Sequence, residues 1–181
     1  MTVLGAGAIG RRLAELLAPH GVELVAVTRR GVTVEGFVRT YGPDRLVTAV
    51  SGARFLVITA PLTEATRGLV DGAVLDALGP RGTLVNLARG PIVDTEALVE
   101  RLRDGRLGCA MLDVTDPEPL PDGHPLWKLD NALITPHVAN PNAGNPWDSH
   151  LPELLEYLAN NVRAFAEGRP RDGTIDIAAG Y

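Results

Sequence analysis

The chain has 181 residues, of which 45% are hydrophobic and 22% charged, and its formal net charge is −5. These values describe a globular chain with an ordinary core, and the acidic balance argues against a nucleic-acid-binding surface. Aromatic residues make up only 4%, too few for a base-stacking platform. The single cysteine, Cys109, excludes an intrachain disulfide. No long apolar segment and no signal peptide is visible, so we expect a cytoplasmic protein without a membrane partner.

Short apolar segments alternate with helix-like segments along most of the chain. The strand-like segments are 2–5, 22–27, 54–60, 82–88, 108–114 and 131–136. Segments 8–21, 70–79 and 94–105 have the apolar periodicity of helices, with Ile9, Leu13, Leu16 and Leu17 on one face of the first. This alternation predicts the α/β class with a doubly wound parallel sheet.

The C-terminal part of the chain departs from this alternation. Residues 140–150 are rich in Asn, Pro and Gly and predict a loop. A helix is expected at 152–167, with one apolar stripe formed by Leu154, Leu155, Leu158, Val162 and Phe165. We therefore divide the chain into an α/β domain at 1–149 and a C-terminal helix and tail at 150–181.

Three glycines near the N-terminus form the pattern G-x-G-x-x-G at Gly5, Gly7 and Gly10. The pattern alone is weak, but here it follows a strand and opens an amphipathic helix, as in dinucleotide-binding folds. The backbone of Gly5, Gly7, Ala8, Ile9 and Gly10 would then face the pyrophosphate at the helix N-terminus. The competing interpretation is a turn that only connects the strand to the helix.

The end of the second strand indicates which dinucleotide binds. NAD-specific proteins place a carboxylate there for the ribose hydroxyls, whereas this chain has Thr28, Arg29 and Arg30. Two guanidiniums and a hydroxyl suit the 2′-phosphate of NADP, which arginine can bind through two hydrogen bonds. We therefore expect NADP in preference to NAD, unless these arginines merely solvate a turn.

Three further polar residues follow predicted strands. Arg89, Glu118 and His137 each lie at or beyond the carboxyl end of a strand-like segment. In open parallel sheets this is the edge where ligands bind. These residues are therefore candidates for a site next to the glycine turn.

The segments that hold these residues carry a recognisable series of motifs. After the glycine turn come PLT at 61–63, NLARGPIVD at 86–94, DVTDPEPLP at 113–121, HPLW at 124–127 and TPH at 135–137. In this order and spacing the chain resembles the D-isomer-specific 2-hydroxyacid dehydrogenases over essentially its whole length. The resemblance implies a Rossmann-type domain and an oxidoreductase that interconverts a small 2-oxo acid and a D-2-hydroxy acid.

The resemblance also implies the catalytic roles. His137 would be the general acid in reduction and the base in the reverse reaction. Glu118 would hydrogen-bond the other ring nitrogen and fix its tautomer, and Arg89 would hold the substrate carboxylate. A structural ion pair between Arg89 and Glu118 is the competing interpretation.

Further cofactor contacts are implied by the same resemblance, and no metal is implied. They would come from loops at the ends of the later strands. These residues are Ala60, Pro61, Thr66, Leu87, Ala88, Asp113 and His137.

Members of the family carry a substrate domain ahead of the glycine turn, and we expect this chain to lack it. One hypothesis is a reductase completed by oligomerisation, with the cofactor domains forming a homodimer. The other is an isolated NADP(H)-binding module or partner subunit without useful turnover. The helix at 152–167 would normally pack on the substrate domain, so its apolar stripe predicts self-association.

Overall fold

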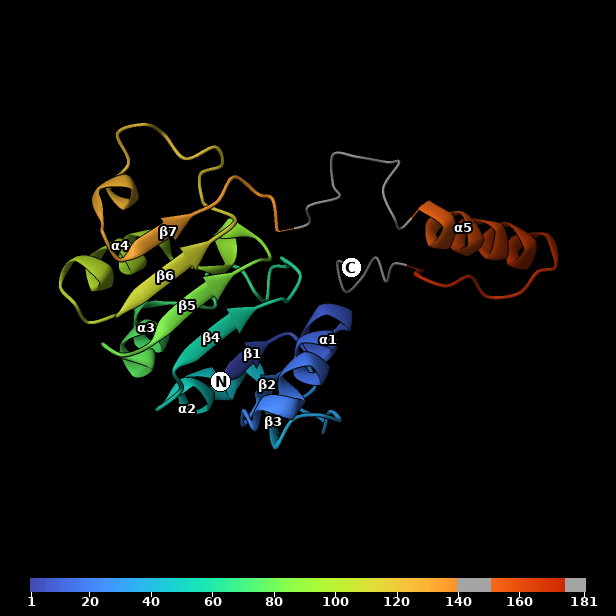
Figure 1. The fold of residues 1–181 in the computed structure, drawn as a ribbon, viewed down its shortest axis with the longest axis horizontal. Coiled ribbons are helices and arrows are strands. Elements are labelled where there is room, and N and C mark those ends of the chain that lie inside the picture. The colour runs from blue at the N-terminus through green and yellow to red at the C-terminus, as the bar shows by residue number, and fades with distance from the viewer. Residues whose placement is uncertain (140–150, 175–181) are drawn as a thin grey trace. The chain divides into compact units, whose positions relative to one another are not determined.

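The computed structural model describes residues 1–139 and 151–174 (Figure 1). By its internal contacts the chain divides into two compact units, residues 1–137 and 138–181. The boundary expected from the sequence, between 149 and 150, lies outside the described residues. Each unit is therefore described by itself.

The first unit is built on a seven-stranded sheet in which every neighbouring pair of strands is parallel. The spatial order is β3-β2-β1-β4-β5-β6-β7. Successive strands are therefore added toward one edge of the sheet from β1 to β3 and toward the other edge from β4 to β7. This order confirms the predicted doubly wound Rossmann-type fold. The strands are β1 (Thr2–Leu4), β2 (Val25–Val27), β3 (Arg39–Tyr41), β4 (Phe55–Ile58), β5 (Thr83–Asn86), β6 (Cys109–Leu112) and β7 (Ala132–Ile134).

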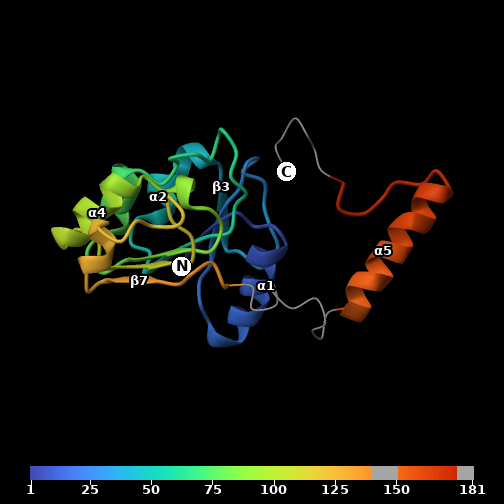
Figure 2. The ribbon, with the colours of Figure 1, turned by 90° about the horizontal axis from the view of Figure 1, so that it is seen from above.

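Helices lie on both sides of this sheet (Figure 2). On one side, α2 (Leu46–Val50) and α4 (Thr95–Arg103) contact α3 (Gly72–Leu78), which lies between them. The other side carries α1 (Ala8–Leu17). Short 3₁₀ turns complete the unit at Ala18–His20, Pro43–Arg45, Gly90–Ile92 and Pro125–Lys128.

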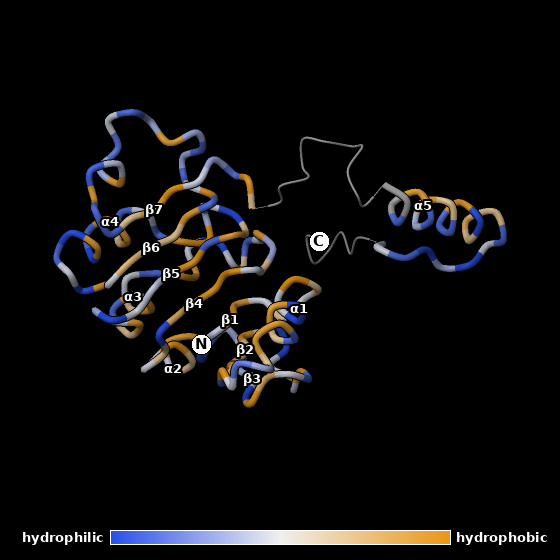
Figure 3. Tube along the Cα trace, viewed as in Figure 1, coloured by the Kyte–Doolittle hydropathy of each residue, from blue (hydrophilic) through white to orange (hydrophobic). Residues whose placement is uncertain are grey.

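The core follows the alternation of side chains along each strand. The larger buried cluster fills the side covered by α2, α3 and α4 and includes Leu56, Leu84 and Leu112. A smaller cluster lies on the other side, where Val3 and Ala26 pack under α1. Strands β4 and β7 are among the hydrophobic parts of the trace in Figure 3.

The structure has two features that the sequence patterns do not predict. Strand β3 is not predicted because Arg39, Thr40 and Tyr41 form no apolar segment, and helix α2 is not predicted because five residues are too few to show a periodicity. On α1, Ile9 and Leu16, which the sequence places on one apolar face, are 63% and 55% exposed. The buried residues of α1 are the small Gly10 and Ala14, because the helix lies close to the sheet there.

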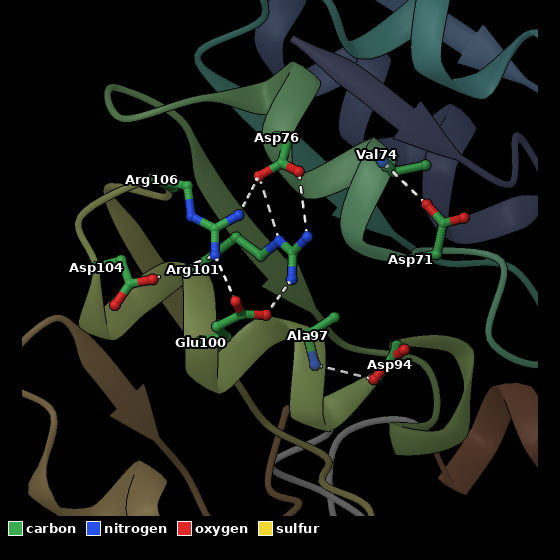
Figure 4. Close-up of polar contacts among 9 residues, drawn as sticks. All are labelled: Asp71, Val74, Asp76, Asp94, Ala97, Glu100, Arg101, Asp104 and Arg106. Atoms are coloured by element: carbon green, nitrogen blue, oxygen red, sulfur yellow. Dashed lines mark hydrogen bonds and ion pairs between the residues drawn. The ribbon is translucent and has the colours of Figure 1, made fainter.

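Polar contacts cap the N-termini of α3 and α4 and join the two helices to each other (Figure 4). The carboxylates of Asp71 and Asp94 cap the two helices by accepting hydrogen bonds from Val74 N and Ala97 N, each at 3.0 Å. Asp76 on α3 accepts two hydrogen bonds of 3.2 Å from the guanidinium of Arg101 on α4. These contacts fix the helix layer behind the sheet.

The second unit contains α5 (Leu151–Ala166), close to the predicted helix. The segment after it folds back, since Tyr157 Oη and Asn161 Nδ2 both donate to the carbonyl oxygen of Asp172, at 2.8 and 3.2 Å. Four residues of the predicted apolar stripe have exposed side chains: Leu155, Leu158, Val162 and Phe165.

Candidate active site

The glycine turn lies at the carboxyl end of β1, where the strand order reverses. Gly5 has a φ of +99°, which favours glycine, and a Cβ there would lie 2.6 Å from Ala60 N. A Cβ on Gly10 would overlap the carbonyl oxygen of Gly5. By contrast, a Cβ on Gly7 would meet no atom of the described residues within 4 Å. Gly5 and Gly10 therefore serve packing, and Gly7 leaves the start of α1 accessible.

The start of α1 suits an anion. Gly7 is its N-cap residue and provides no side-chain cap, and the first turn holds no acidic residue. The free backbone N–H groups and the positive end of the helix dipole therefore face outward from the sheet edge. This is the chemistry that binds a pyrophosphate.

The loop after β4 lies directly against the glycine turn. Thr59 Oγ1 donates a hydrogen bond of 2.6 Å to Gly5 O, and Ala60 is 7% exposed. Farther along, Thr66 Oγ1 donates to Pro61 O at 2.8 Å and accepts from Thr63 N at 2.8 Å. Thr66 thus shapes the loop that holds the expected contacts Ala60 and Pro61.

The predicted cofactor-selecting residues form a turn after β2. Thr28 N donates to Tyr41 O at the end of β3, at 3.0 Å, and Gly31 N donates to Thr28 Oγ1 at 3.2 Å. Arg29 and Arg30 occupy the tip of this turn and are exposed. The structure therefore presents both guanidiniums at the same sheet edge as the glycine turn.

Asn86, at the end of β5, builds the turn that carries Arg89. Its side chain is 1% exposed, donates to Arg89 O at 3.0 Å and accepts from Ala88 N at 3.1 Å. Arg89 is exposed and its Nη1 donates to Ala88 O at 2.6 Å. Leu87, another expected cofactor contact, is 41% exposed beside it.

The loop after β6 is packed against this turn. A Cβ on Gly90 would overlap the carbonyl group of Thr115, so only glycine allows the two backbones to approach this closely. Thr115 Oγ1 in turn donates to Pro117 O at 2.9 Å. The contact fixes the segment with Arg89 relative to the segment that leads to Glu118.

The ends of β6 and β7 meet through side chains. Asp113 is 4% exposed, and its Oδ1 accepts a hydrogen bond of 2.5 Å from Thr135 Oγ1. Two residues later, His137 has a φ of +56°, a conformation rare for a non-glycine residue, and its backbone N–H donates to Thr135 O at 3.0 Å. Asp113 and Thr135 thus support the backbone from which His137 projects.

His137 and Glu118 form the central contact of the site. His137 Nδ1 and Glu118 Oε1 are 2.6 Å apart, and both side chains are partly exposed, at 49% and 39%. The bond occupies Nδ1, so Nε2 is the ring nitrogen available to a substrate. Within 1–139 and 151–174 no ion pair joins Arg89 to Glu118, contrary to the competing interpretation of these residues.

Two other kinds of site find no support in the described residues. No group of three or more His, Cys, Asp or Glu side chains among them could hold a metal ion. None of the helices within 1–139 and 151–174 combines the length and apolar character that crossing a bilayer requires.

Comparison with known proteins identifies this arrangement. The profile of the D-isomer specific 2-hydroxyacid dehydrogenase family, NAD binding domain, matches residues 1–139. The chain belongs to this family. The resemblance inferred from the linked motifs is thereby confirmed.

Curated relatives in the family are longer than this chain. A glyoxylate/hydroxypyruvate reductase A from Enterobacter sp. (strain 638) is 34% identical over 179 residues, which are 99% of this chain and 55% of that protein. An uncharacterized protein from Corynebacterium melassecola, encoded in the proB 3′ region, is 41% identical over 182 residues, 100% of this chain and 58% of that protein. The chain therefore spans little more than half the length of these relatives.

Solved structures in the family share the fold. A D-isomer specific 2-hydroxyacid dehydrogenase from Xanthobacter autotrophicus Py2, in complex with NADPH and MES, has a TM-score of 0.89 and 36% identity, covering 100% of this chain and 72% of that one. An NADPH-dependent glyoxylate/hydroxypyruvate reductase from Sinorhizobium meliloti, in complex with NADP and sulfate, has a TM-score of 0.84 and 30% identity, covering 99% and 56%.

The sequence assigned no role to three residues that organise the site, although Asn86 and Thr135 lie in the quoted motifs at 86–94 and 135–137. Thr59 and Thr135 each bond a neighbouring loop through a side chain, and Asn86 bonds the turn that follows it. All three are polar residues at or just after the end of an apolar strand, and that position is the signal that could have found them. They hold loops in place around the candidate site.

Proposed function

We propose that this chain is the cofactor-binding and proton-transferring part of an NADPH-linked reductase for small 2-oxo acids. The observation that carries the proposal is the 2.6 Å contact between His137 and Glu118 at the same sheet edge as the glycine turn. A histidine paired with a carboxylate is a general acid with a fixed tautomer. Glyoxylate and hydroxypyruvate are the first substrates to test, since reductases for them are among the relatives.

The chain's own residues fit the cofactor. The open space at Gly7 and the uncapped start of α1 provide N–H donors for a pyrophosphate. The turn from Thr28 to Gly31 carries no carboxylate, so a 2′-phosphate meets Arg29 and Arg30 without repulsion. These features favour NADPH over NADH, as do the NADPH and the NADP bound in two structural relatives.

The proposed mechanism assigns one task to each polar residue. Bound NADPH supplies the hydride that reduces the carbonyl carbon. Arg89 binds the carboxylate of the 2-oxo acid and orients the carbonyl. Protonated His137 donates a proton from Nε2 to the carbonyl oxygen as the alcohol forms, and Glu118 stabilises the imidazolium before that transfer. In the reverse reaction His137 accepts the proton.

A second function is favoured by the length of the relatives. The chain matches only 58% and 55% of the length of two curated relatives, so residues outside the match can help to close the site in those proteins. The chain alone would then bind NADPH without turnover. Exclusion of water from a hydride-transfer site requires walls on all sides, which favours this alternative for the isolated chain.

The deciding experiment follows NADPH oxidation by the purified chain, with a panel of 2-oxo acids that includes glyoxylate and hydroxypyruvate. The reductase proposal expects turnover that falls by at least about a hundredfold in His137→Ala. Turnover that His137→Ala leaves unchanged would contradict the proposed role of the histidine. NADPH binding without turnover in a folded protein would support the binding-module alternative.

We also propose that the protein forms a homodimer, as most soluble oligomers are symmetric dimers. The exposed apolar stripe of α5 gives the chain a surface that water disfavours. Light scattering across a range of concentrations tests this, and a monomer at high concentration would contradict it.

A further inference from the structure

The carbonyl group of Gly5 is the first group of the glycine turn that the sheet does not hold. Just before it, Leu4 O accepts a hydrogen bond of 2.9 Å from Thr59 N, and Gly5 N donates one of 2.9 Å to Val27 O at the end of β2. Gly5 O instead accepts its hydrogen bond from a side chain, the hydroxyl of Thr59, at 2.6 Å. No other donor within 1–139 and 151–174 bonds to this oxygen. Its orientation therefore depends on one hydroxyl.

Held in this way, the carbonyl oxygen of Gly5 lies between β4 and the first turn of α1. A Cβ on Gly10 would overlap Gly5 O and would lie 3.2 Å from Thr59 Oγ1, so the carbonyl, the hydroxyl and the helix meet at one point. The start of α1 at Gly7 is by contrast exposed and open. The oxygen is thus packed among protein atoms and away from the open space at Gly7.

Gly5 has no side chain that would restrict this orientation. Glycine rotates about its Cα–C bond at little steric cost, and the planar trans peptide bond makes the oxygen of Gly5 turn together with the N–H of Ala6. A buried carbonyl oxygen that loses its donor is costly to keep. Without the hydroxyl, Gly5 O would therefore turn toward solvent at the start of α1, where its partial negative charge would repel a phosphate.

We propose that Thr59 is a positioning residue for the cofactor: its hydroxyl keeps the carbonyl of Gly5 turned away from the pyrophosphate. The inference rests on the proposed function, since it takes NADPH to be the ligand of the glycine turn. Thr59 acts through Gly5 O and preserves the donor character of the start of α1.

This role separates two parts of the cofactor. The pyrophosphate lies on the glycine turn and should depend on Thr59. The 2′-phosphate is assigned to Arg29 and Arg30, on the turn after β2, whose own hydrogen bonds involve Tyr41 and not Gly5. Adenosine 2′-phosphate carries the 2′-phosphate but no pyrophosphate, so its binding should not depend on the hydroxyl.

The test compares Thr59→Ala with Thr59→Ser in the full 181-residue chain, because these two variants differ only in the hydroxyl. We expect the dissociation constant for NADPH to rise at least about tenfold in Thr59→Ala and to stay within about twofold of the parent in Thr59→Ser. Fluorescence titration measures NADPH, and calorimetric titration measures adenosine 2′-phosphate, which should bind the parent and both variants equally.

Thr2→Ala is the matched control. Thr2 is 1% exposed, and its Oγ1 also donates a hydrogen bond of 2.6 Å to a backbone carbonyl, that of Ala49. It lies at the start of β1, whereas the glycine turn follows the end of this strand. Thr2→Ala should therefore lower the thermal unfolding temperature and leave the dissociation constant for NADPH unchanged.

The other outcomes count against the positioning role. NADPH binding that Thr59→Ala leaves unchanged overturns it, as does a Thr59→Ser variant that binds as weakly as Thr59→Ala. Equal weakening of NADPH and adenosine 2′-phosphate also overturns it, because the hydroxyl would then support the fold of the whole site. A folded parent protein that binds no NADPH at all contradicts the proposed function itself, and this inference with it.

Discussion

Gly90 lies so close to the carbonyl group of Thr115 that the two loops after β5 and β6 pack backbone against backbone. One loop carries Arg89 and the other leads to Glu118. The close approach of Gly90 and Thr115 therefore fixes the backbone next to Arg89 relative to the loop that leads to Glu118.

Replacing Gly90 with alanine should destabilise the fold. The added Cβ would overlap backbone atoms, which cannot rotate away as a side chain could, so we expect a loss of about 1 to 3 kcal/mol. Urea unfolding followed by circular dichroism measures it. Gly123→Ala is the control, because no atom of the described residues lies within 4 Å of its Cβ, and it should change stability by less than about 0.5 kcal/mol. Equal stability of the two variants would contradict the close packing.

Alanine variants of Gly7 and Gly10 should differ in effect: the first should weaken NADPH binding and the second should lower the stability of the fold. Gly7→Ala fills accessible space at the start of α1, so the protein should fold normally but bind NADPH at least about tenfold more weakly, a loss of about 1.4 kcal/mol. Gly10→Ala gains about 1 kcal/mol of helix propensity but overlaps Gly5 O, and the overlap should outweigh the gain. Fluorescence titration and thermal unfolding of both variants test the contrast. Tight NADPH binding by Gly7→Ala would exclude the pyrophosphate from this turn.

The sequence predicted the parts of the fold that repeat a pattern. Six apolar segments became strands, because a buried parallel strand needs apolar residues on both sides. Strand β3 escaped because Arg39, Thr40 and Tyr41 form a short, partly exposed edge strand without that signal. The exposure of Ile9 and Leu16 was missed because periodicity finds the apolar half of a helix, and the sheet determines which part of it is buried.

The candidate site was predictable as a set of residues and less so as a geometry. His137 and Glu118 are 19 positions apart, and their meeting follows from lying after neighbouring strands, β6 and β7. The contact of Asp113 with Thr135 depends on the path of the backbone beyond the strands. Local sequence patterns contain no information about that path, since it is set by packing between loops.

The ion pairs between α3 and α4 should make the free energy of unfolding depend on pH. Hydrogen bonds from Arg101 lower the pKa of Asp76 below its usual value of 3.8. A carboxyl with a lowered folded-state pKa stabilises the fold above its unfolded pKa, and the effect disappears as the pH falls through the folded value. Asp76→Asn should therefore cost less than about 1 kcal/mol at pH 7, because the pair is exposed to solvent.

Urea unfolding at neutral pH and at a pH well below 3.8 tests this dependence. The difference between Asp76→Asn and the parent protein should shrink toward zero at the acid pH. Asp104→Asn is the control, since Asp104 bonds only the more exposed Arg106 in this cluster and should matter less. A difference that stays constant with pH would show that the charge of Asp76 is not what stabilises the helix pair.

Changing Thr28 to aspartate should move the cofactor preference toward NADH. The new carboxylate would repel the 2′-phosphate and could bond the ribose hydroxyls of NAD. It can also keep the turn, by accepting the hydrogen bond that Gly31 N now donates to Thr28 Oγ1. We expect the ratio of the dissociation constants for NADPH and NADH to rise at least about tenfold. Fluorescence titration measures both constants, with Thr28→Ser as the control, and an unchanged ratio would remove this turn from cofactor selection.

Glu118→Gln should slow reduction without weakening NADPH binding. The amide can still bond His137 Nδ1, now 2.6 Å from the carboxylate, but it carries no charge to stabilise the imidazolium. We expect kcat for 2-oxo acid reduction to fall at least about tenfold, about 1.4 kcal/mol of transition-state stabilisation. Glu96→Gln, on an exposed face of α4, is the matched control and should retain full activity. A Glu118→Gln variant with the parent kcat would mean that the carboxylate only holds the loop after β6 against the loop after β7.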